Sequence, residues 1–326
     1  MKRSYMMLSV ALLCSIAAHS TSVSASNTYP DKPVRLIVPF SPGGPTDTIC
    51  RIVAAKLSLV LQQTVVVDNR EGAGGVIGAR AAASAAPDGY TLFCASTSTL
   101  AILPTLNKNL GYDPVQSFEP IALTGSAPLV MVVSNKRKFK TVADVIAFAK
   151  SNPGTLNYGS AGVGTPPHLT GELFKSLTGL QITHIPYKGA GPAFNDVMAG
   201  QIDFLFAATS IMASADRGRV TPMLVTAPTR SKSLPMIPSS AEAGLPKLTF
   251  NSWNGIVAPK GTPQPIIERL NKAVNDAITD PVVTNELIKQ GYDVEALGAK
   301  HFEAFVRNEV QGVKSIVDML GNAARE

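Results

Sequence analysis

The chain has 326 residues, with 29 lysine and arginine residues, 23 acidic residues and a formal net charge of +6. This length exceeds one typical domain and favours two lobes of about 150 residues each. The densest basic stretch, residues 135–140, carries no nucleic-acid-binding motif, so we interpret it as a solvated turn and expect no nucleic-acid partner.

Residues 1–25 are predicted to form a secretory signal peptide. Lys2 and Arg3 supply its positive start, an apolar run covers residues 6–18, and residues 23–25 resemble an A-x-A cleavage site. The apolar run is too short to span a bilayer as a stable helix. We therefore expect the mature chain to be soluble and exported to the periplasm.

After this leader the sequence alternates between strand and helix patterns. Residues 34–38 form a β-rich run that leads into a helix ending near Leu61, and residues 65–67 form a short strand. A Gly-rich stretch at 71–75 opens a second helix, and residues 90–95 form the next strand. These β-α-β units predict a parallel sheet with helices on both faces, in which ligands bind at the carboxyl ends of the strands.

The second half continues this pattern. Residues 118–133 are expected to carry the chain into a second lobe and residues 250–255 to return it, so that two crossings form a hinge. Thr141 and Asp144 predict a capping box at the start of a helix. The last predicted helix should close the first lobe. The three helices predicted after the return are at 265–279, 281–290 and 301–320.

One motif appears twice in the sequence. Residues 38–47 and residues 156–165 each combine a strand, a Gly-rich turn and the start of a helix. A helix start offers unpaired N–H groups and a partial positive charge, so each turn suits a small anion. Two such turns in separate lobes predict a solute-binding clamp that presents both of them to one ligand.

The candidate ligand-binding residues lie in these turns and in the strands that follow. In the first lobe, the ligand is expected to pack on Phe40 and to receive hydrogen bonds from Gly43, Gly44, Thr46, Asp47 and Ser96. In the second lobe, a carboxylate is expected to be held by Ser160, Ala161, Gly162, Gly164 and Thr165, beside His168, Tyr187 and Ala207.

Some of these side chains have an alternative, structural interpretation. Asp47, like Asp203 in the second half, is interpreted as a helix cap or a brace for its loop rather than as half of a catalytic carboxylate pair. Tyr187 is either a wall of the pocket or a core aromatic residue. His168 either contacts the ligand or lies on the surface at a helix start. Lys188 is interpreted as a solvated lysine rather than as the partner of an anionic ligand.

An exported hydrolase is the alternative function. Residues 158–162 resemble a nucleophile elbow around Ser160, but Tyr158 replaces the first glycine of G-x-S-x-G. His168 follows Ser160 at a helix start, whereas the histidine of a serine triad normally comes from a separate, later loop. We therefore expect no enzymatic activity.

The sequence also predicts neither a cofactor nor a metal. The glycines at 159, 162 and 164 do not have the dinucleotide-binding spacing, and no Walker lysine follows a Gly-rich turn. The scattered histidines and cysteines give no metal-ligand spacing. Cys50 and Cys94 are expected to be buried free thiols, with a single disulfide as the alternative in an oxidising compartment.

Short motifs that belong together are spread over the mature chain. They are Tyr29–Pro33, Val38–Phe40, Gly43-Gly44, Thr46-Asp47, Arg51, Asn69-Arg70, Gly72–Gly75, Pro87–Leu92, Asn152–Gly154, Tyr158–Ser160, Pro186–Gly189, Gly200–Asp203, Leu234-Pro235, Glu242–Gly244 and Trp253. In combination these motifs resemble the Bug family, the periplasmic solute-binding proteins of tripartite tricarboxylate transporters. Glu71 departs from the family pattern, which usually has proline there. Residues 206–208 are more apolar than this region often is, which leaves room for an aromatic or aliphatic ligand body.

The resemblance implies an α/β, two-lobed periplasmic-binding-protein fold of the type II-like Venus flytrap kind, with a ligand cleft between the lobes. We place the first lobe at residues 26–130 plus 252–326 and the second at residues 131–251. The resemblance also implies that a small carboxylate is bound through backbone N–H groups, hydroxyls and waters, and is delivered to the membrane permease subunits of a tripartite transporter. We expect a monomer, and a ligand-sensing partner of a membrane signalling protein is the alternative to transport.

Overall fold

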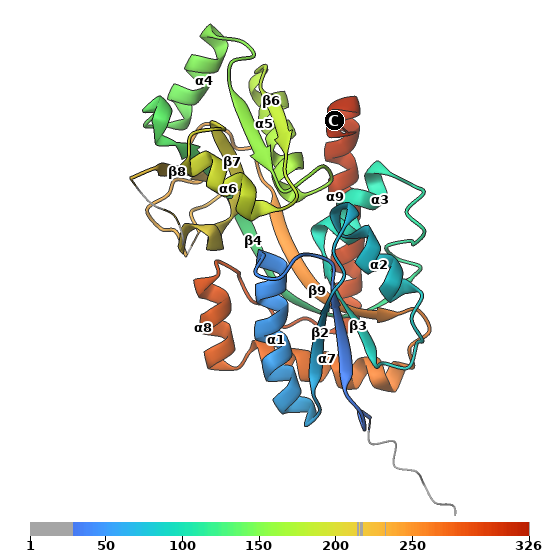
Figure 1. Cartoon of the computed structure of the whole chain (residues 1–326). Coiled ribbons are helices and arrows are strands. Elements are labelled where there is room, and N and C mark those ends of the chain that lie inside the picture. Colours follow the sequence, from blue (N-terminus) through green and yellow to red (C-terminus); the bar gives the residue numbers. More distant parts are fainter. Residues whose placement is uncertain (1–28, 214, 216–217, 232, 326) are drawn as a thin grey trace, which may run out of the picture.

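The computed structural model describes residues 29–325 except 214, 216, 217 and 232, so the predicted signal peptide lies outside the described residues. The described chain forms two α/β lobes joined by long strands (Figure 1). Within these ranges, none of the helices combines the length and the apolar composition that a membrane span requires.

The first lobe is built on the predicted parallel strands. The central strand β1 (Val34–Val38) pairs with β2 (Val65–Asn69) on one side and with β3 (Thr91–Ser96) on the other. Helix α1 (Pro45–Leu61) connects β1 to β2, and helix α2 (Val76–Ala83) connects β2 to β3. The β-α-β order expected for this part of the chain is therefore present.

Helix α1 owes its position to a stripe of apolar side chains. Pro45 occupies the first turn, where its missing N–H costs nothing, and Gln62 ends the helix in the left-handed conformation. Ile49, Val53 and Leu57 recur every four residues and are fully buried in the core of the first lobe. Helices α7 (Gln264–Ile278) and α8 (Pro281–Lys289) pack against α1. Their residue bounds are close to the predicted ones.

A disulfide joins Cys50 of α1 to Cys94 of β3, which corrects the expectation of two free thiols. Cys50 lies on the same helix face as Ile49 and Val53, and the side chain of Cys94 joins the same core cluster. The two Cα atoms are 6.5 Å apart, within the range that a disulfide spans. The packing of α1 on β3 therefore brings together two cysteines whose proximity their spacing in the sequence does not reveal.

The second lobe repeats the parallel arrangement. Strand β5 (Asn157–Ser160) pairs with β6 (Thr183–Pro186) and with β7 (Phe204–Ala208). Helices α5 (Pro166–Thr178) and α6 (Ala190–Met198) make the two connections.

Helix α4 (Val142–Ser151) leads into the second lobe and begins at the predicted capping box. The Asp144 backbone N–H donates to the Thr141 hydroxyl at 3.2 Å, and the Thr141 N–H donates to the Asp144 carboxylate at 3.0 Å. Two of the unpaired donors at this helix start are thereby satisfied.

Two long strands connect the lobes, as the sequence predicts. The first half of β4 (Phe118–Ser134) pairs antiparallel with β9 (Asn251–Pro259), and its second half pairs with β7 and β8 (Val220–Val225). The result is one continuous sheet in the order β2-β1-β3-β9-β4-β7-β5-β6, with β8 beside β4. In Figure 1, β4 and β9 run side by side through the waist of the molecule.

The last long helix, α9 (Ala299–Leu320), contacts both lobes and does not only close the first. Phe302 and Val306 are buried with Trp253 in the first lobe, whereas Val313 and Val317 join the core of the second. One apolar stripe therefore continues along the helix from one core to the other. The residue bounds of the lobes, at 130/131 and 251/252, stay a prediction.

The segment after β3 also crosses between the lobes. A π-helical turn, η2 (Ser98–Ile102), leads into the short helix α3 (Leu103–Leu106). Ala101 and Ile102 are fully buried in the core of the second lobe, although the segment follows a strand of the first. The small hydroxyl residues that follow β3 therefore lie where the two lobes meet.

Candidate functional site

A cleft of about 1060 Å³ lies between the two lobes. Its first-lobe wall comes from the segments at 39–46 and 71–75, and its second-lobe wall from the segments at 161–167 and 187–192. Four predicted site residues, Asp47, Ser160, Gly164 and His168, do not line it. The ten predicted residues that do are Phe40, Gly43, Gly44, Thr46, Ser96, Ala161, Gly162, Thr165, Tyr187 and Ala207.

The first turn of α1 faces this cleft with unpaired backbone donors. Gly44 is the N-cap, and the first backbone hydrogen bond of the helix runs from the Thr48 N–H to the Gly44 carbonyl at 2.9 Å. Among the described residues, the N–H groups of Thr46 and Asp47 have no acceptor. These are the donors that a helix start offers to an anion. Neither side chain caps the helix, so the cap that was one of the two interpretations of Asp47 is not formed.

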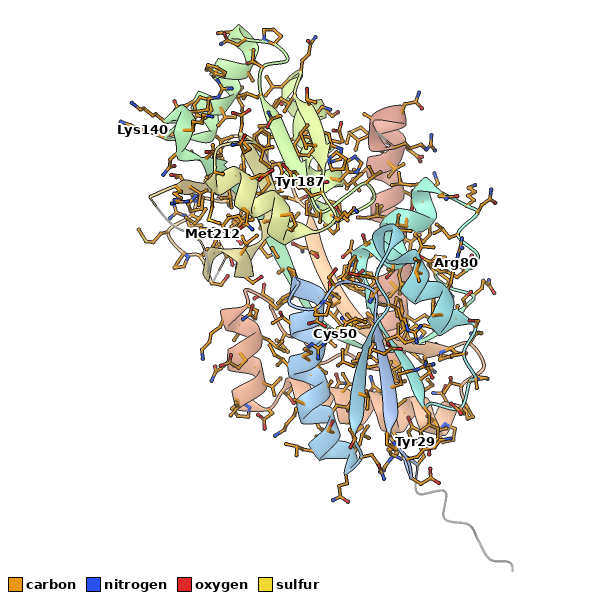
Figure 2. The ribbon with its side chains drawn as sticks, viewed as in Figure 1. Tyr29, Cys50, Arg80, Lys140, Tyr187 and Met212 are labelled. Atoms are coloured by element: carbon orange, nitrogen blue, oxygen red, sulfur yellow. A yellow bond between two sulfur atoms is a disulfide. The ribbon has the colours of Figure 1, made fainter. Side chains whose placement is uncertain are left out.

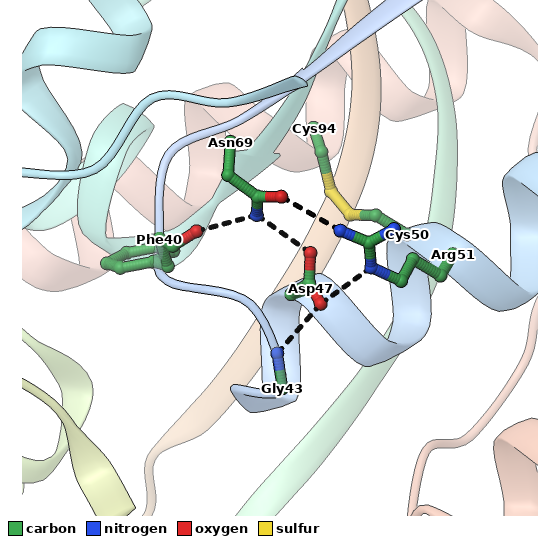
Figure 3. A network of polar contacts seen from close by, with 7 residues as sticks. All are labelled: Phe40, Gly43, Asp47, Cys50, Arg51, Asn69 and Cys94. Atoms are coloured by element: carbon green, nitrogen blue, oxygen red, sulfur yellow. Dashed lines mark hydrogen bonds and ion pairs between the residues drawn. A yellow bond between two sulfur atoms is a disulfide. The ribbon is translucent and has the colours of Figure 1, made fainter. Parts of the chain in front are cut away.

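Asp47 braces the turn from behind (Figure 3). The carboxylate is buried and accepts hydrogen bonds from the Gly43 N–H at 2.9 Å, from Arg51 Nε at 2.8 Å and from Asn69 Nδ2 at 2.8 Å. The same Asn69 amide donates to the Phe40 carbonyl at 2.8 Å. Both ends of the turn are therefore tied to one buried carboxylate, and the interpretation of Asp47 as a loop brace is confirmed.

The charge of Asp47 is stabilised within this network. Burial by itself opposes ionisation, but the hydrogen bonds from Arg51, Asn69 and Gly43 outweigh it and hold the pKa of the carboxyl below its usual value. The folded protein therefore keeps this group charged to a lower pH than the unfolded chain does. Its contribution to stability is present at neutral pH and is lost as the pH falls through the folded-state pKa.

A third turn, at residues 71–75, was not assigned to the site from the sequence. Four consecutive residues, Gly72 to Gly75, have positive φ angles, and a Cβ atom on Gly75 would lie 2.7 Å from Thr99 Cγ2. The Ser41 hydroxyl bonds to the Glu71 carboxylate and so joins this turn to the first one. The position of this turn in the sequence could have indicated its role. The turn follows β2, which is parallel to β1, so it lies at the same edge of the sheet as the first turn.

The second-lobe turn offers fewer donors than expected. Ser160 is 1% exposed, and its hydroxyl lies 2.7 Å from His184 Nε2 and accepts from the Gly162 N–H at 3.0 Å. Pro166 and Pro167 open α5 and have no N–H groups to donate. Ser160 therefore braces the turn and is not among the residues that line the cleft, and its assignment as a ligand-binding residue stays a prediction.

His168 is not a surface residue, which was one of its two expected alternatives, and it is not among the residues that line the cleft. Its side chain is fully buried, and its ring centroid lies 4.5 Å from that of His184. Nδ1 faces the Gly164 N–H at 3.4 Å, so the ring helps to hold the turn from inside the lobe. Burial, and then the nearby His184 and Lys175, lower the pKa of His168 to about 3.

This buried histidine predicts a loss of stability in mild acid. The unfolded chain takes up a proton near pH 6.5, whereas folded His168 stays neutral down to about pH 3, so stability falls as the pH drops through this window. We expect a loss of about 2 kcal/mol between pH 7 and pH 5 from this group. Urea unfolding at several pH values measures it. In His168→Gln the loss should shrink; the same dependence of stability on pH in His168→Gln and in wild type would contradict the prediction.

Tyr187 forms part of the cleft wall, which was one of its two expected alternatives. Tyr187 lies in the second lobe, just before α6 (Figure 2). Its hydroxyl donates to Asp196 Oδ2 of α6 at 2.6 Å, so the ring and not the polar tip is left for the cleft. Burial and the Asp196 carboxylate raise the pKa of Tyr187 to about 12. The neighbouring Lys188 also lines the cleft and is exposed.

Three further lining residues come from the return strand β9, from the segment after α8 and from η2. Ser252 lies on β9, Tyr292 follows α8, and Ser98 starts η2. The sequence pattern identified residues 250–255 only as the return between the lobes. Within the described ranges, no three or more histidine, cysteine or acidic side chains gather in a way that could hold a metal ion.

A large cleft between two α/β lobes, with a helix start from each lobe at its wall, defines a solute-binding protein. Residues 49–322 match the tripartite tricarboxylate transporter family receptor, and the chain belongs to this family. It is 35% identical to protein BugT of Bordetella pertussis over 314 residues, which cover 96% of each chain. The resemblance to Bug proteins seen in the sequence is thereby confirmed.

Solved structures confirm the α/β, two-lobed periplasmic-binding-protein fold. Rpa4515 of R. palustris, solved with adipate, is 32% identical, with a TM-score of 0.85 over 90% of this chain and 98% of its own. MatC from Rhodopseudomonas palustris, solved with bound malate, is 31% identical, with a TM-score of 0.83 over 89% of this chain and 100% of its own.

Proposed function

We propose that this protein captures a small organic carboxylate in the periplasm and delivers it to the permease of a tripartite tricarboxylate-type transporter. The observation that carries the proposal is the convergence of Gly-rich turns from both lobes on one cleft of about 1060 Å³. Its size and its position between lobes are typical of small-molecule sites. The malate and adipate bound by two relatives support a carboxylate as the ligand.

The electrostatics of the cleft favour a carboxylate held mainly by neutral donors. In the part of the chain that the structure describes, Glu71 and Lys188 are the only ionic side chains that line the cleft, and both are exposed. The unpaired N–H groups of Thr46 and Asp47 carry the partial positive charge of the α1 start and are placed to bind one carboxylate. The ring of Phe40 and the side chain of Val163 offer apolar surface for the ligand body.

We assign ligand contact to the ten predicted residues that line the cleft, together with Ser98 and Tyr292. Asp47 acts through its backbone N–H, and its carboxylate only positions the turn. Ser160, Gly164 and His168 hold the second-lobe turn from behind. We further propose that the protein acts as a monomer, without enzymatic activity, after removal of residues 1–25.

The test is the melting temperature of the mature protein against a panel of di-, tri- and aromatic carboxylates, with neutral sugars as controls. The protein is first unfolded and refolded to remove any ligand that co-purified. A ligand at 100 times its dissociation constant adds about 2.7 kcal/mol, which raises the melting temperature by about 5 °C. A shift with one class of carboxylate and none with the sugars is expected. Shifts with sugars alone, or with nothing, would contradict the carboxylate assignment.

A further inference from the structure

Three hydroxyl groups in the cleft have hydrogen positions that their partners determine. Thr46, Ser98 and Thr165 all line the cleft, and each hydroxyl has one hydrogen to donate and two lone pairs to accept. The hydrogen bonds that each already makes therefore decide what it can still offer to a ligand. Because Glu71 and Lys188, both exposed, are the only ionic side chains that line the cleft among the described residues, these remaining donors and acceptors weigh heavily in recognition.

The hydroxyl of Thr46 is left as a donor. Asn254, buried on β9, directs its Nδ2 towards the Ala95 carbonyl at 3.4 Å and towards Thr46 Oγ1 at 3.3 Å. The carbonyl can only accept, so it fixes the orientation of the Asn254 amide, and Asn254 Oδ1 correspondingly faces the Tyr292 hydroxyl at 3.3 Å. Thr46 Oγ1 thus accepts from Asn254 and has no acceptor of its own among the described residues. Its hydrogen is available to the cleft.

The hydroxyls of Ser98 and Thr165 are left as acceptors. Ser98 Oγ donates to the Gly164 carbonyl at 2.6 Å, and Thr165 Oγ1 donates to the Gly162 carbonyl at 2.6 Å. Each has therefore used its only hydrogen. Both carbonyls belong to the same second-lobe turn, so a first-lobe and a second-lobe hydroxyl are bound to that turn and have only lone pairs to offer.

We propose that the ligand presents an acceptor oxygen to Thr46 and a hydrogen-bond donor, a hydroxyl or an N–H, to Ser98 and Thr165. This deepens the proposed function and rests on it, because it divides carboxylates into those with a protic substituent and those without. An unsubstituted acid would place C–H groups against two acceptors that have lost their water. The favoured ligand class is thus hydroxy- or amino-substituted carboxylates.

Isothermal titration with matched acids tests this class. The first series is succinate, malate and aspartate, which differ only in hydrogen, hydroxyl or ammonium at one carbon. The second is glutarate, 2-hydroxyglutarate and glutamate, and the third is 3-phenylpropionate, phenyllactate and phenylalanine. Within a series that binds, we expect a substituted acid to bind at least about tenfold more tightly than its parent. Comparison of the hydroxy acid with the amino acid of a series shows whether the site prefers a hydroxyl or an N–H donor. A parent acid that binds as tightly as both derivatives would overturn the proposal.

Two substitutions separate the donor from the acceptors. Ser98→Ala removes an acceptor and should weaken the hydroxy or amino acid more than its parent, so that their affinity ratio falls towards one. Thr46→Val removes the donor and should weaken all members of a series by a similar factor, with the ratio retained. Thr46→Ser keeps the hydroxyl and should bind all members of a series about as tightly as wild type does. A ratio that Ser98→Ala leaves as in wild type would count against the assignment.

Neutron diffraction from crystals of the deuterated protein tests the hydrogen positions without any ligand. We expect the Thr46 deuteron on the cleft side, and the Ser98 and Thr165 deuterons on the carbonyls of Gly164 and Gly162. A Thr46 deuteron directed at Asn254, or a Ser98 or Thr165 deuteron directed into the cleft, would overturn the proposal. If the deuterons lie as expected and no acid of any series binds, the carboxylate function fails while the polarity of the cleft stands.

Discussion

Replacement of both Cys50 and Cys94 by alanine is expected to lower the free energy of unfolding by about 4 kcal/mol. The disulfide spans a sequence separation of 44 residues, and a cross-link over a loop of that length restricts the unfolded chain by about this amount. Urea unfolding followed by the fluorescence of Trp253, the only tryptophan, measures the change. Trp253 is fully buried in the first lobe and reports on its unfolding.

The single variants provide the control. Either Cys50→Ala or Cys94→Ala breaks the same bond, so each should cost nearly as much as the double variant. Two independent free thiols would instead give two smaller losses that add in the double variant. Additive losses, or a wild-type protein whose stability is unchanged after denaturation and refolding with a reductant, would contradict a disulfide between these residues.

Asp47→Ala is expected to weaken ligand binding at least about tenfold and to cost about 2–3 kcal/mol of stability. The substitution removes the acceptor of the Gly43 N–H, Arg51 and Asn69, and so frees the turn that carries the unpaired N–H groups of Thr46 and Asp47. Binding is measured by calorimetry with the carboxylate that gives the largest melting shift, and stability by urea unfolding.

Asp203→Ala is a matched control for this variant. Asp203 is also a nearly buried carboxylate, and it accepts from the Asn157 N–H at 2.9 Å and from Arg137 Nε at 2.8 Å. It does not line the cleft. Its replacement should therefore lower stability by a similar amount without a comparable loss of affinity. Equal losses of affinity in both variants would show that Asp47 acts only through general stability.

Most of the fold could be predicted from local sequence patterns. The bounds of β1 match the prediction, because an aliphatic run interrupted only by Arg35 precedes a proline and a Gly-rich turn. The capping box at Thr141 was also predictable, since it depends on residues three apart. The role of α9 was not, because its amphipathic stripe shows that one face is buried but not that Phe302 and Val317 belong to different cores.

The candidate site was predictable where backbone geometry follows from the turn itself. The positions of Phe40, Thr46 and Ala161 at the cleft follow from the carboxyl ends of parallel strands. Side-chain roles that depend on long-range partners were not predictable. Ser160 is occupied by His184 from the neighbouring strand β6, and the direction of the Thr46 hydroxyl depends on Asn254 of β9. Neither partner is near in sequence.

The central claim is that the cleft between the lobes binds an organic carboxylate, and a cleft-filling substitution tests it most directly. Ala161 lines the cleft, whereas Ala147 is exposed on α4 and does not, so Ala161→Trp and Ala147→Trp form a matched pair. The measurement is the calorimetric affinity of both variants for the best carboxylate of the melting panel. We predict at least a hundredfold loss for Ala161→Trp and wild-type affinity for Ala147→Trp, with both proteins folded. Wild-type affinity in folded Ala161→Trp would contradict a ligand site in this cleft.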